Sequence, residues 1–271
     1  MPEHIYNLVP SIPDQRDFLY SAPMGVALPP NADLGTAIPP IKDQGQEGSC
    51  TGFSLSSARE ALAKEHGNYL PFSPAFIYYQ ERKIEHDTNQ DAGAQIRDGL
   101  KVLTHAGVCP ESDFPYVVGG FKQAPPAAAV RDAKQYTITS YSRLPSLSAL
   151  QAAIANKQPV VLGIAVYPSF EAVGADGKVP MPGPTEGPLG GHAILVNEEE
   201  NNLLAEIAYP SGTTLWTYGH AGVGGSARAA RVADAERRVE CAARRRSPHP
   251  QRASHRRDGP PGRLLLAGDL R

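Results

Sequence analysis

Apolar residues recur every three to four positions in three successive segments of the chain, a spacing that predicts amphipathic helices. These segments are residues 49–67, 73–84 and 94–107. Ser49 stands directly before the first apolar residue of its segment, where a helix-capping side chain is expected. Three helices in succession indicate a helical lobe over about residues 28–122.

The pattern changes in the second half of the chain, where it becomes typical of strands. Residues 136–141 alternate and are β-branched or aromatic, while residues 160–166 and 192–196 are continuous apolar runs. One short helix is predicted between them, over residues 146–155. We therefore expect a second lobe, over about residues 130–218, that is built from a sheet or barrel.

Three segments lack either pattern. Residues 1–27 are rich in proline and predict an extended arm that lies over the surface of a folded domain spanning residues 28–218. Residues 123–130 are rich in Pro and Ala and predict a link between the lobes. Residues 219–271 hold many Arg, Ala, Gly and Pro residues but few large apolar ones, which predicts a disordered tail.

Composition narrows the classes of function. The net charge of −2 gives no basic field for nucleic acid or an anionic membrane, so neither is expected as a partner. The three cysteines lie far apart without a C-x-x-C pair, which argues against a disulfide framework and a structural zinc site. No secretory signal, membrane-spanning run, phosphate loop or dinucleotide motif is recognisable, which favours a cytoplasmic protein without metal or cofactor. The oligomeric state stays open.

Cys50 is the most informative of the cysteines, because it falls in the first turn of a predicted helix. Unpaired N–H groups and the helix dipole stabilise a thiolate at such a place, although a small cysteine can also simply pack there. Gln44 lies on the preceding Gly-containing loop, from which its amide could turn toward the backbone N–H of Cys50. His192 follows Gly190 and Gly191 and could equally be an ordinary strand-end histidine.

Taken together, "DQGQEGSC", the helix after it and the distant "GGHAILV" resemble the papain-like cysteine peptidases, in particular the disulfide-poor bacterial and archaeal members. His192 lies 142 residues after Cys50, within the gap of about 130 to 150 residues that is usual for the family. "LPPNADLG", "SPAFIYY" and "DAGAQIRDGLKVLTHAGVCPE" extend the resemblance over about residues 28–196.

The resemblance implies an α+β, papain-like two-lobed fold, with a helical N-terminal lobe and an incomplete, antiparallel β-barrel-like second lobe. It also implies a hydrolase of the thiol protease type that acts on peptides or proteins. Cys50 is then the nucleophile, His192 is its ion-pair partner and proton donor, and Gln44 supplies an amide of the oxyanion hole. Gly93 and Gly191 are expected to bind substrate, Gly93 through its backbone to an extended chain, and Gly191 where its missing side chain leaves room beside the imidazole.

The sequence departs from the family pattern in ways that leave other functions open. Glu47 replaces a disulfide cysteine three residues before the nucleophile, and Thr51 replaces an aromatic residue. The Asn-Ser-Trp-Gly motif whose Asn orients the imidazole is missing, and a change of reading frame after Val196 is one hypothesis for this loss. The alternatives are therefore a peptide-binding pseudoenzyme, or a transpeptidase or amide ligase that uses the same acyl-enzyme.

Overall fold

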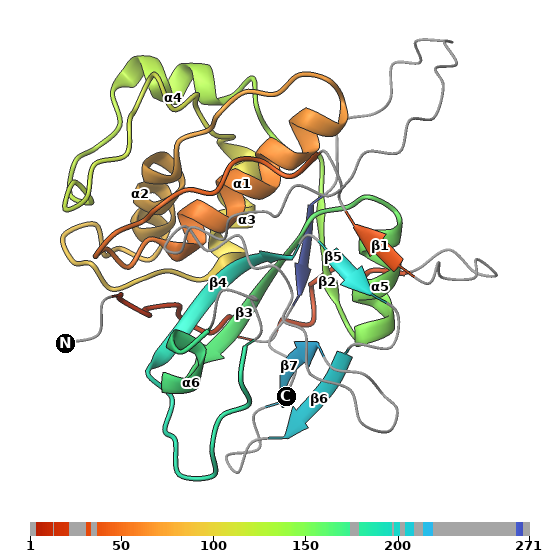
Figure 1. Cartoon of the computed structure of the whole chain (residues 1–271). Coiled ribbons are helices and arrows are strands. Elements are labelled where there is room, and N and C mark those ends of the chain that lie inside the picture. The colour runs from red at the N-terminus through yellow and green to blue at the C-terminus, as the bar shows by residue number, and fades with distance from the viewer. Residues whose placement is uncertain are drawn as a thin grey trace, which may run out of the picture.

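The computed structural model describes residues 4–12, 14–21, 31–33, 37–173, 179–196, 198–200, 204–208, 214–218 and 264–267. Helices α1 to α4 gather on one side of the molecule, and strands β3 and β4 lie on the other (Figure 1). α1 contacts both of these strands. This is the two-lobed, mixed helix and sheet arrangement that the sequence predicts. Among the described residues, no helix combines the length and the apolar character that crossing a membrane requires.

The three predicted helices form as α1 (Cys50–Glu65), α2 (Pro74–Ile84) and α3 (Ile96–His105). α2 begins where the sequence predicts it, because Ser73 accepts a hydrogen bond from the N–H of Phe76 and Pro74 fits the first turn. All three helices contact one another and form the core of the helical lobe.

Two details of the helical lobe differ from the prediction. Ser49 precedes α1 but makes no capping hydrogen bond, because its hydroxyl instead shares a hydrogen bond of 2.9 Å with the Tyr116 hydroxyl. The segment predicted to be a link contains helix α4 (Ala127–Ala133). Its alanines have the highest helix propensity of any residue, and Pro126 lies before the first turn, where it breaks no hydrogen bond.

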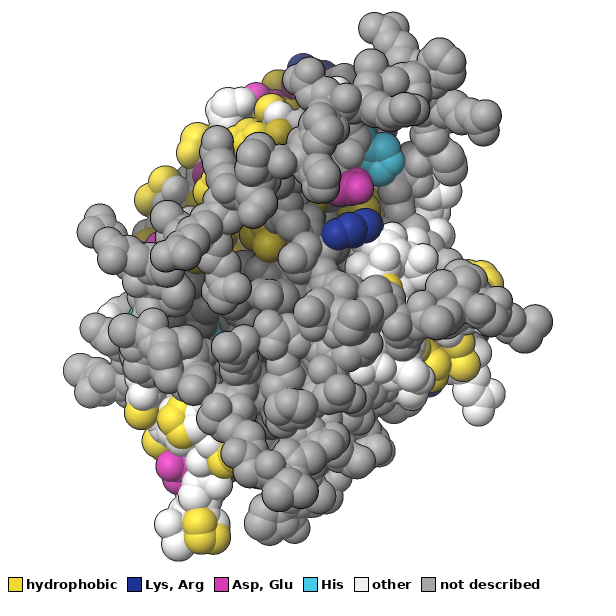
Figure 2. Space-filling view, turned by 45° about the vertical axis from the view of Figure 1, so that its right-hand side comes forward, with side chains coloured by type: hydrophobic (Ala, Val, Ile, Leu, Met, Phe, Trp, Pro, Cys, Tyr) yellow, Lys and Arg dark blue, Asp and Glu magenta, His cyan; other side chains and the backbone are white. Residues whose placement is uncertain are grey.

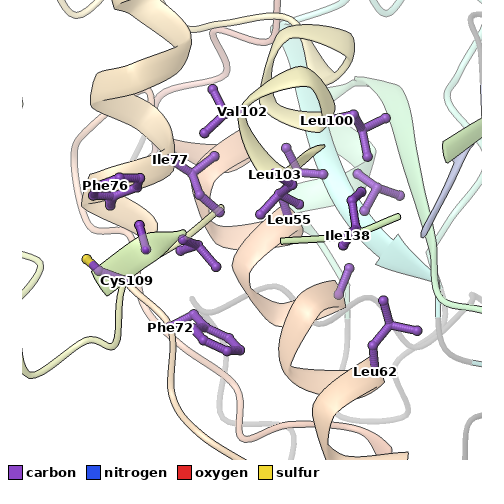
Figure 3. Close-up of a cluster of buried hydrophobic side chains, with 14 of the residues drawn as sticks. Leu55, Leu62, Phe72, Phe76, Ile77, Leu100, Val102, Leu103, Cys109 and Ile138 are labelled. Carbon is purple, nitrogen blue, oxygen red and sulfur yellow. The ribbon is translucent and has the colours of Figure 1, made fainter. Parts of the chain in front are cut away.

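The largest cluster of buried apolar side chains fills the interior of the helical lobe (Figure 3) and extends to the sheet. Leu55 and Leu62 of α1 contribute to it from one side, and Val161 of β3 and Leu195 of β4 from the other. Burying such side chains is worth about 1.5–3 kcal/mol each. The cluster therefore fixes α1 against the sheet.

The second lobe is built on an open four-stranded sheet in the order β2-β8-β3-β4. Its elements are β2 (Tyr141–Leu144), α5 (Leu147–Ala155), β3 (Val160–Val166), α6 (Pro168–Glu171), β4 (Gly190–Val196) and β8 (Leu264–Ala267). β3 and β4 are antiparallel, whereas β8 runs parallel to both β2 and β3. The sheet is thus mixed rather than purely antiparallel, and among the described strands it is not closed into a barrel.

The strand predicted over residues 136–141 starts only at Tyr141. A local turn and a tertiary contact override the strand pattern here, because the N–H of Tyr136 closes a turn onto Ala133 and the N–H of Ile138 donates to Leu103. The helix predicted from Ser146 is confirmed as α5, with the Ser146 hydroxyl accepting from the N–H of Ala149.

Two further pairs of strands flank the main sheet. β1 (Asn31–Asp33) pairs with β5 (Glu198–Glu200), and β6 (Leu204–Ala208) pairs with β7 (Thr214–Tyr218), both antiparallel. The sequence predicts disorder for all of residues 219–271, and here the structure differs at β8. Its Leu-Leu-Leu-Ala sequence is the continuous apolar run that suits an interior strand. The rest of that tail lies outside the described residues.

Candidate active site

Cys50 is the first residue of α1 and only 1% exposed. It belongs to the main apolar cluster, so its backbone is held by the packing of the whole helix. The side chain sits at the helix N-terminus, where unpaired N–H groups favour a negative charge.

His192 is the third residue of β4, opposite Ile164 of β3, and is 3% exposed. α1 contacts β4 directly. Ala193, the neighbour of His192, belongs to the same apolar cluster as Cys50. The predicted nucleophile and the predicted base therefore lie on two elements that pack against each other.

Gln44 is buried in the loop before α1, with 3% of its surface exposed. Its side-chain amide donates a hydrogen bond of 3.0 Å to the carbonyl of Glu47. The Tyr116 hydroxyl donates to the carbonyl of Gln44 at 2.6 Å. The hydrogen bond between Gln44 and Glu47 thus closes the loop, and the one from Tyr116 joins the loop to the rest of the helical lobe.

Glu47, at the position of the family's disulfide cysteine, is buried and accepts the N–H of Gly119 at 2.9 Å. Burial raises the pKa of this carboxyl above its usual value. Polar contacts from Glu47 and from Tyr116 thus connect the loop to the segment around residues 116–119.

Gly93 adopts a positive φ of 77°, which glycine accepts without strain, and its N–H donates to the Tyr78 hydroxyl at 3.2 Å. That hydroxyl donates in turn to the carboxylate of Asp91. Burial, and then the hydrogen bond to Asp91, raise the pKa of Tyr78, so the phenol stays protonated. These contacts hold the glycine loop in one shape.

The segment at residues 4–12 lies against the predicted site. Asn7 pairs with Gly191 in a parallel bridge, and its side chain lies 3.1 Å from the place of a Cβ at Gly48. A Cβ at Gly93 would overlap the carbonyl oxygen of Asn7. The loop before Cys50, the loop at Gly93 and the strand that carries His192 therefore all contact Asn7.

Tyr6 covers the predicted base. Its ring meets that of His192 edge-on, with centroids 5.6 Å apart and an interplanar angle of 86°. Its hydroxyl donates to Glu171 of α6 at 3.1 Å. The sequence predicts that this arm lies over a surface, but no local signal in it identifies Tyr6 or Asn7 as residues at the site.

Glu81 is a second residue that the sequence does not identify. It is completely buried under the first turn of α1, where the Thr51 hydroxyl donates to it at 2.7 Å. Burial raises its pKa well above the usual value, which keeps the carboxyl neutral. The only signal in the sequence is Thr51 itself, a hydroxyl where the family has an aromatic residue.

The sequence contains no Asn-Ser-Trp-Gly motif to orient His192, and the asparagines that follow this histidine are too close to it in the chain to take that place. Asn197, Asn201 and Asn202 all lie outside the described residues. No three His, Cys, Asp or Glu side chains gather as metal ligands within the described ranges. On the face seen in Figure 2, the described charged side chains are scattered and of both signs, with a basic side chain beside an acidic one.

Three comparisons place the chain among known proteins. The model of the papain family of cysteine proteases matches residues 28–175, which include Gln44 and Cys50 and end before His192. An uncharacterized peptidase C1-like protein of Acanthamoeba polyphaga mimivirus is 32% identical over 185 residues. That match covers 62% of this chain and 60% of the viral protein.

Solved structures agree with the sequence comparison. Xylellain, a cysteine protease from Xylella fastidiosa, is 34% identical with a TM-score of 0.68, over 79% of this chain and 89% of that one. Procathepsin B of Trypanosoma congolense, at 15% identity and a TM-score of 0.55 over 78% of this chain and 75% of that one, shares the fold. With more than half of its length matched by the family model, this chain belongs to the papain family of cysteine proteases.

Proposed function

We propose that the protein is a cysteine peptidase that cleaves peptide bonds through an acyl-enzyme formed on Cys50. The observation that supports it is the packing of α1, which has a cysteine at its N-terminus, against β4, the strand that carries a histidine. Family membership supports the same reaction.

In this mechanism His192 takes the proton of the Cys50 thiol and holds the resulting thiolate as an ion pair. The sulfur attacks the scissile carbonyl carbon, and the imidazolium then gives its proton to the leaving amine. Water, deprotonated by the same imidazole, releases the acid product and restores the thiol. The oxyanion is stabilised by the N–H of Cys50 and by the amide of Gln44, whose Nε2 donates one of its two N–H groups to Glu47 and keeps the other for the oxyanion.

The test combines alkylation with turnover. Iodoacetamide labelling is followed by mass spectrometry at pH 6 on the full chain and on a chain that begins at Ser11, because Tyr6 and Asn7 lie against the site. We expect rapid labelling at Cys50 that is lost in His192→Ala, and cleavage of a fluorogenic peptide that both Cys50→Ala and His192→Ala abolish.

Cys109 serves as an internal control for the labelling. It is fully buried, and burial raises the pKa of its thiol to about 12, so it should react slowly at pH 6 in every variant. If Cys50 reacts as slowly as Cys109 in both chains and no peptide is cleaved, the peptidase proposal is wrong. A protein that still binds peptides would then be a pseudoenzyme.

A further inference from the structure

Tyr116 connects the two places from which the proposed oxyanion donors come. Its hydroxyl donates to the backbone carbonyl of Gln44 at 2.6 Å and lies 2.9 Å from the hydroxyl of Ser49. A phenol carries one proton, and this proton goes to Gln44, so the Ser49 hydroxyl is the donor in the second hydrogen bond. Because Ser49 directly precedes Cys50, the Tyr116 oxygen bridges Gln44 and the neighbour of the predicted nucleophile.

Three further contacts hold the segment that carries Tyr116. Its backbone N–H donates to the carboxylate of Glu111 at 2.8 Å. Its ring meets that of Phe53 on α1 edge-on, with centroids 4.6 Å apart and an interplanar angle of 86°. Two residues earlier, the carbonyl of Phe114 accepts the hydroxyl of Ser73, the residue that caps α2, at 2.6 Å. The segment is therefore fixed to both α1 and α2.

The Tyr116 hydroxyl suits this bridge because it stays protonated. Burial is the largest cause that raises the pKa of Tyr116 above its usual value, and the nearby carboxyl of Glu47 acts in the same direction. The phenol therefore keeps the proton that it gives to Gln44. Gln44 and Ser49 are both buried, which strengthens their hydrogen bonds to this hydroxyl relative to bonds in water.

The residues after Tyr116 lie against the same loop. The N–H of Gly119 donates to the Glu47 carboxylate at 2.9 Å. A Cβ at Gly45 would lie 2.8 Å from a methyl carbon of Val118, so the bare glycine makes this close approach possible. The segment from Tyr116 to Gly119 therefore contacts the loop before α1 along most of its length.

We propose that Tyr116 is a positioning residue for the reaction: its hydroxyl holds Gln44 so that the free N–H of the Gln44 amide and the backbone N–H of Cys50 serve the same oxyanion. The inference rests on the peptidase function proposed above. The amide of Gln44 is held at Glu47 and its carbonyl at Tyr116, so both ends of this residue are fixed. Donors that are fixed in advance need no rearrangement when the oxyanion forms. Tyr116 thus acts through Gln44 and not on the substrate.

Tyr116→Phe in the full chain removes only the hydroxyl and keeps the ring that contacts Phe53. Gln44 then loses its anchor, so kcat for a fluorogenic peptide should fall about 10- to 100-fold, while KM changes by less than about twofold. A merely structural contact would lower the free energy of unfolding and leave kcat and KM as they are. That result, or a raised KM with unchanged kcat, would overturn the proposal.

A double-mutant cycle tests whether Tyr116 acts through Gln44. Gln44→Ala combined with Tyr116→Phe should be no more than about threefold slower than Gln44→Ala alone, because the donor that Tyr116 positions is already gone. Losses that multiply would mean that Tyr116 acts on another group, and the proposal would be wrong. Tyr136→Phe is the matched control. It removes the hydroxyl of a half-buried tyrosine whose ring packs against Phe72, and it should leave kcat unchanged.

Nuclear magnetic resonance tests the positioning without any turnover. The order parameter of the Gln44 side-chain amide is measured in Cys50→Ala, with and without Tyr116→Phe. We expect it to fall when the hydroxyl is removed. An unchanged order parameter in a chain whose Cys50 form cleaves peptides would refute the positioning role alone. A lower order parameter in a protein that cleaves no peptide in any variant would refute the proposed function, but not the hold of Tyr116 on Gln44.

Discussion

The carboxylate of Asp91 accepts the backbone N–H of Gly48 through both of its oxygens, each at 3.0 Å. Gly48 lies two residues before Cys50, and Asp91 lies two residues before Gly93. This charged hydrogen bond therefore joins the loop that precedes the nucleophile to the loop predicted to bind substrate. It connects two parts of the site without a disulfide.

Asp91→Ala should loosen both loops at once, because the N–H of Gly48 and the hydroxyl of Tyr78 both lose their acceptor. We expect the free energy of unfolding to fall by about 1–3 kcal/mol. We expect kcat/KM to fall by about 10- to 100-fold. Urea denaturation and peptide hydrolysis measure the two effects. Asp91→Asn keeps one acceptor oxygen, so its free energy of unfolding and its kcat/KM should fall less than those of Asp91→Ala. Equal losses in the two variants would contradict the proposal that Asp91 holds the two loops together.

Gln44→Ala removes the side-chain donor of the proposed oxyanion hole. Since that donor acts on the transition state, kcat should fall by about 100- to 1,000-fold with little change in KM. Steady-state kinetics on the chain that begins at Ser11 gives both constants. Gln135→Ala, which changes an exposed glutamine shortly after α4, is the control and should leave both constants unchanged. A rise in KM with unchanged kcat would mean that Gln44 only binds substrate.

Glu81→Gln should make stability less dependent on pH. The pKa of Glu81 is raised in the folded protein, so the folded state keeps a proton that the unfolded state releases as pH rises above about 4.5. Stability therefore falls with rising pH by up to about 1.4 kcal/mol per unit, until the raised folded pKa is passed. The glutamine has no titrating proton, so the free energy of unfolding should fall less steeply with pH in the variant. Urea unfolding between pH 5 and 8 measures this slope.

The matched control for Glu81 is Glu65→Gln, an exposed glutamate at the end of α1. It should leave the pH dependence of stability as it is in the unchanged chain. Glu85, whose pKa is raised by burial to about 7, also contributes to the slope and is kept in both variants. If Glu81→Gln and Glu65→Gln give the same slope, Glu81 is not the group that titrates.

Leu55→Ala tests the packing of α1. Leu55 is fully buried within the cluster that fixes this helix against the sheet, so truncation leaves a cavity (Figure 3). We expect a loss of about 2–5 kcal/mol in the free energy of unfolding, measured in urea. Val117→Ala, at a side chain that is 64% exposed, should change stability by less than about 0.5 kcal/mol. Similar values for the two variants would show that the cluster does not hold α1.

Local signals explain which parts of the fold could be predicted. The helix that starts at Pro74 has its cap, its proline and its apolar spacing all within a few residues, and its predicted start and its predicted end near Ile84 agree with the structure. The start of strand β2 depends on contacts with the rest of the fold, and there the local pattern is misleading. Helix α4 follows from the helix propensity of its alanines, which the prediction of a link did not take into account. β8 pairs with residues far away in the chain, a relationship that no window of sequence contains.

The candidate site, like the fold, could be predicted only where short stretches of sequence carry the signal. Cys50, Gln44 and His192 stand in short motifs, so they could be proposed from the sequence, and their roles stay predictions. Tyr6 and Glu81 could not, because each reaches the site only through contacts across the fold. The missing Asn motif stays a prediction as well, since much of the chain after Val196 lies outside the described residues.

The position of β8 has a consequence for how the protein is made. This strand lies between β2 and β3, yet its residues come roughly a hundred positions after those of β3 with which they pair. Synthesis must therefore reach Ala267 before β8 can pair in the middle of the sheet. Until then β2 and the edge of β3 that faces β8 present unpaired backbone groups. A nascent chain in this state is a ready target for chaperones and for self-association, whereas its helical lobe, built from close neighbours, can fold early.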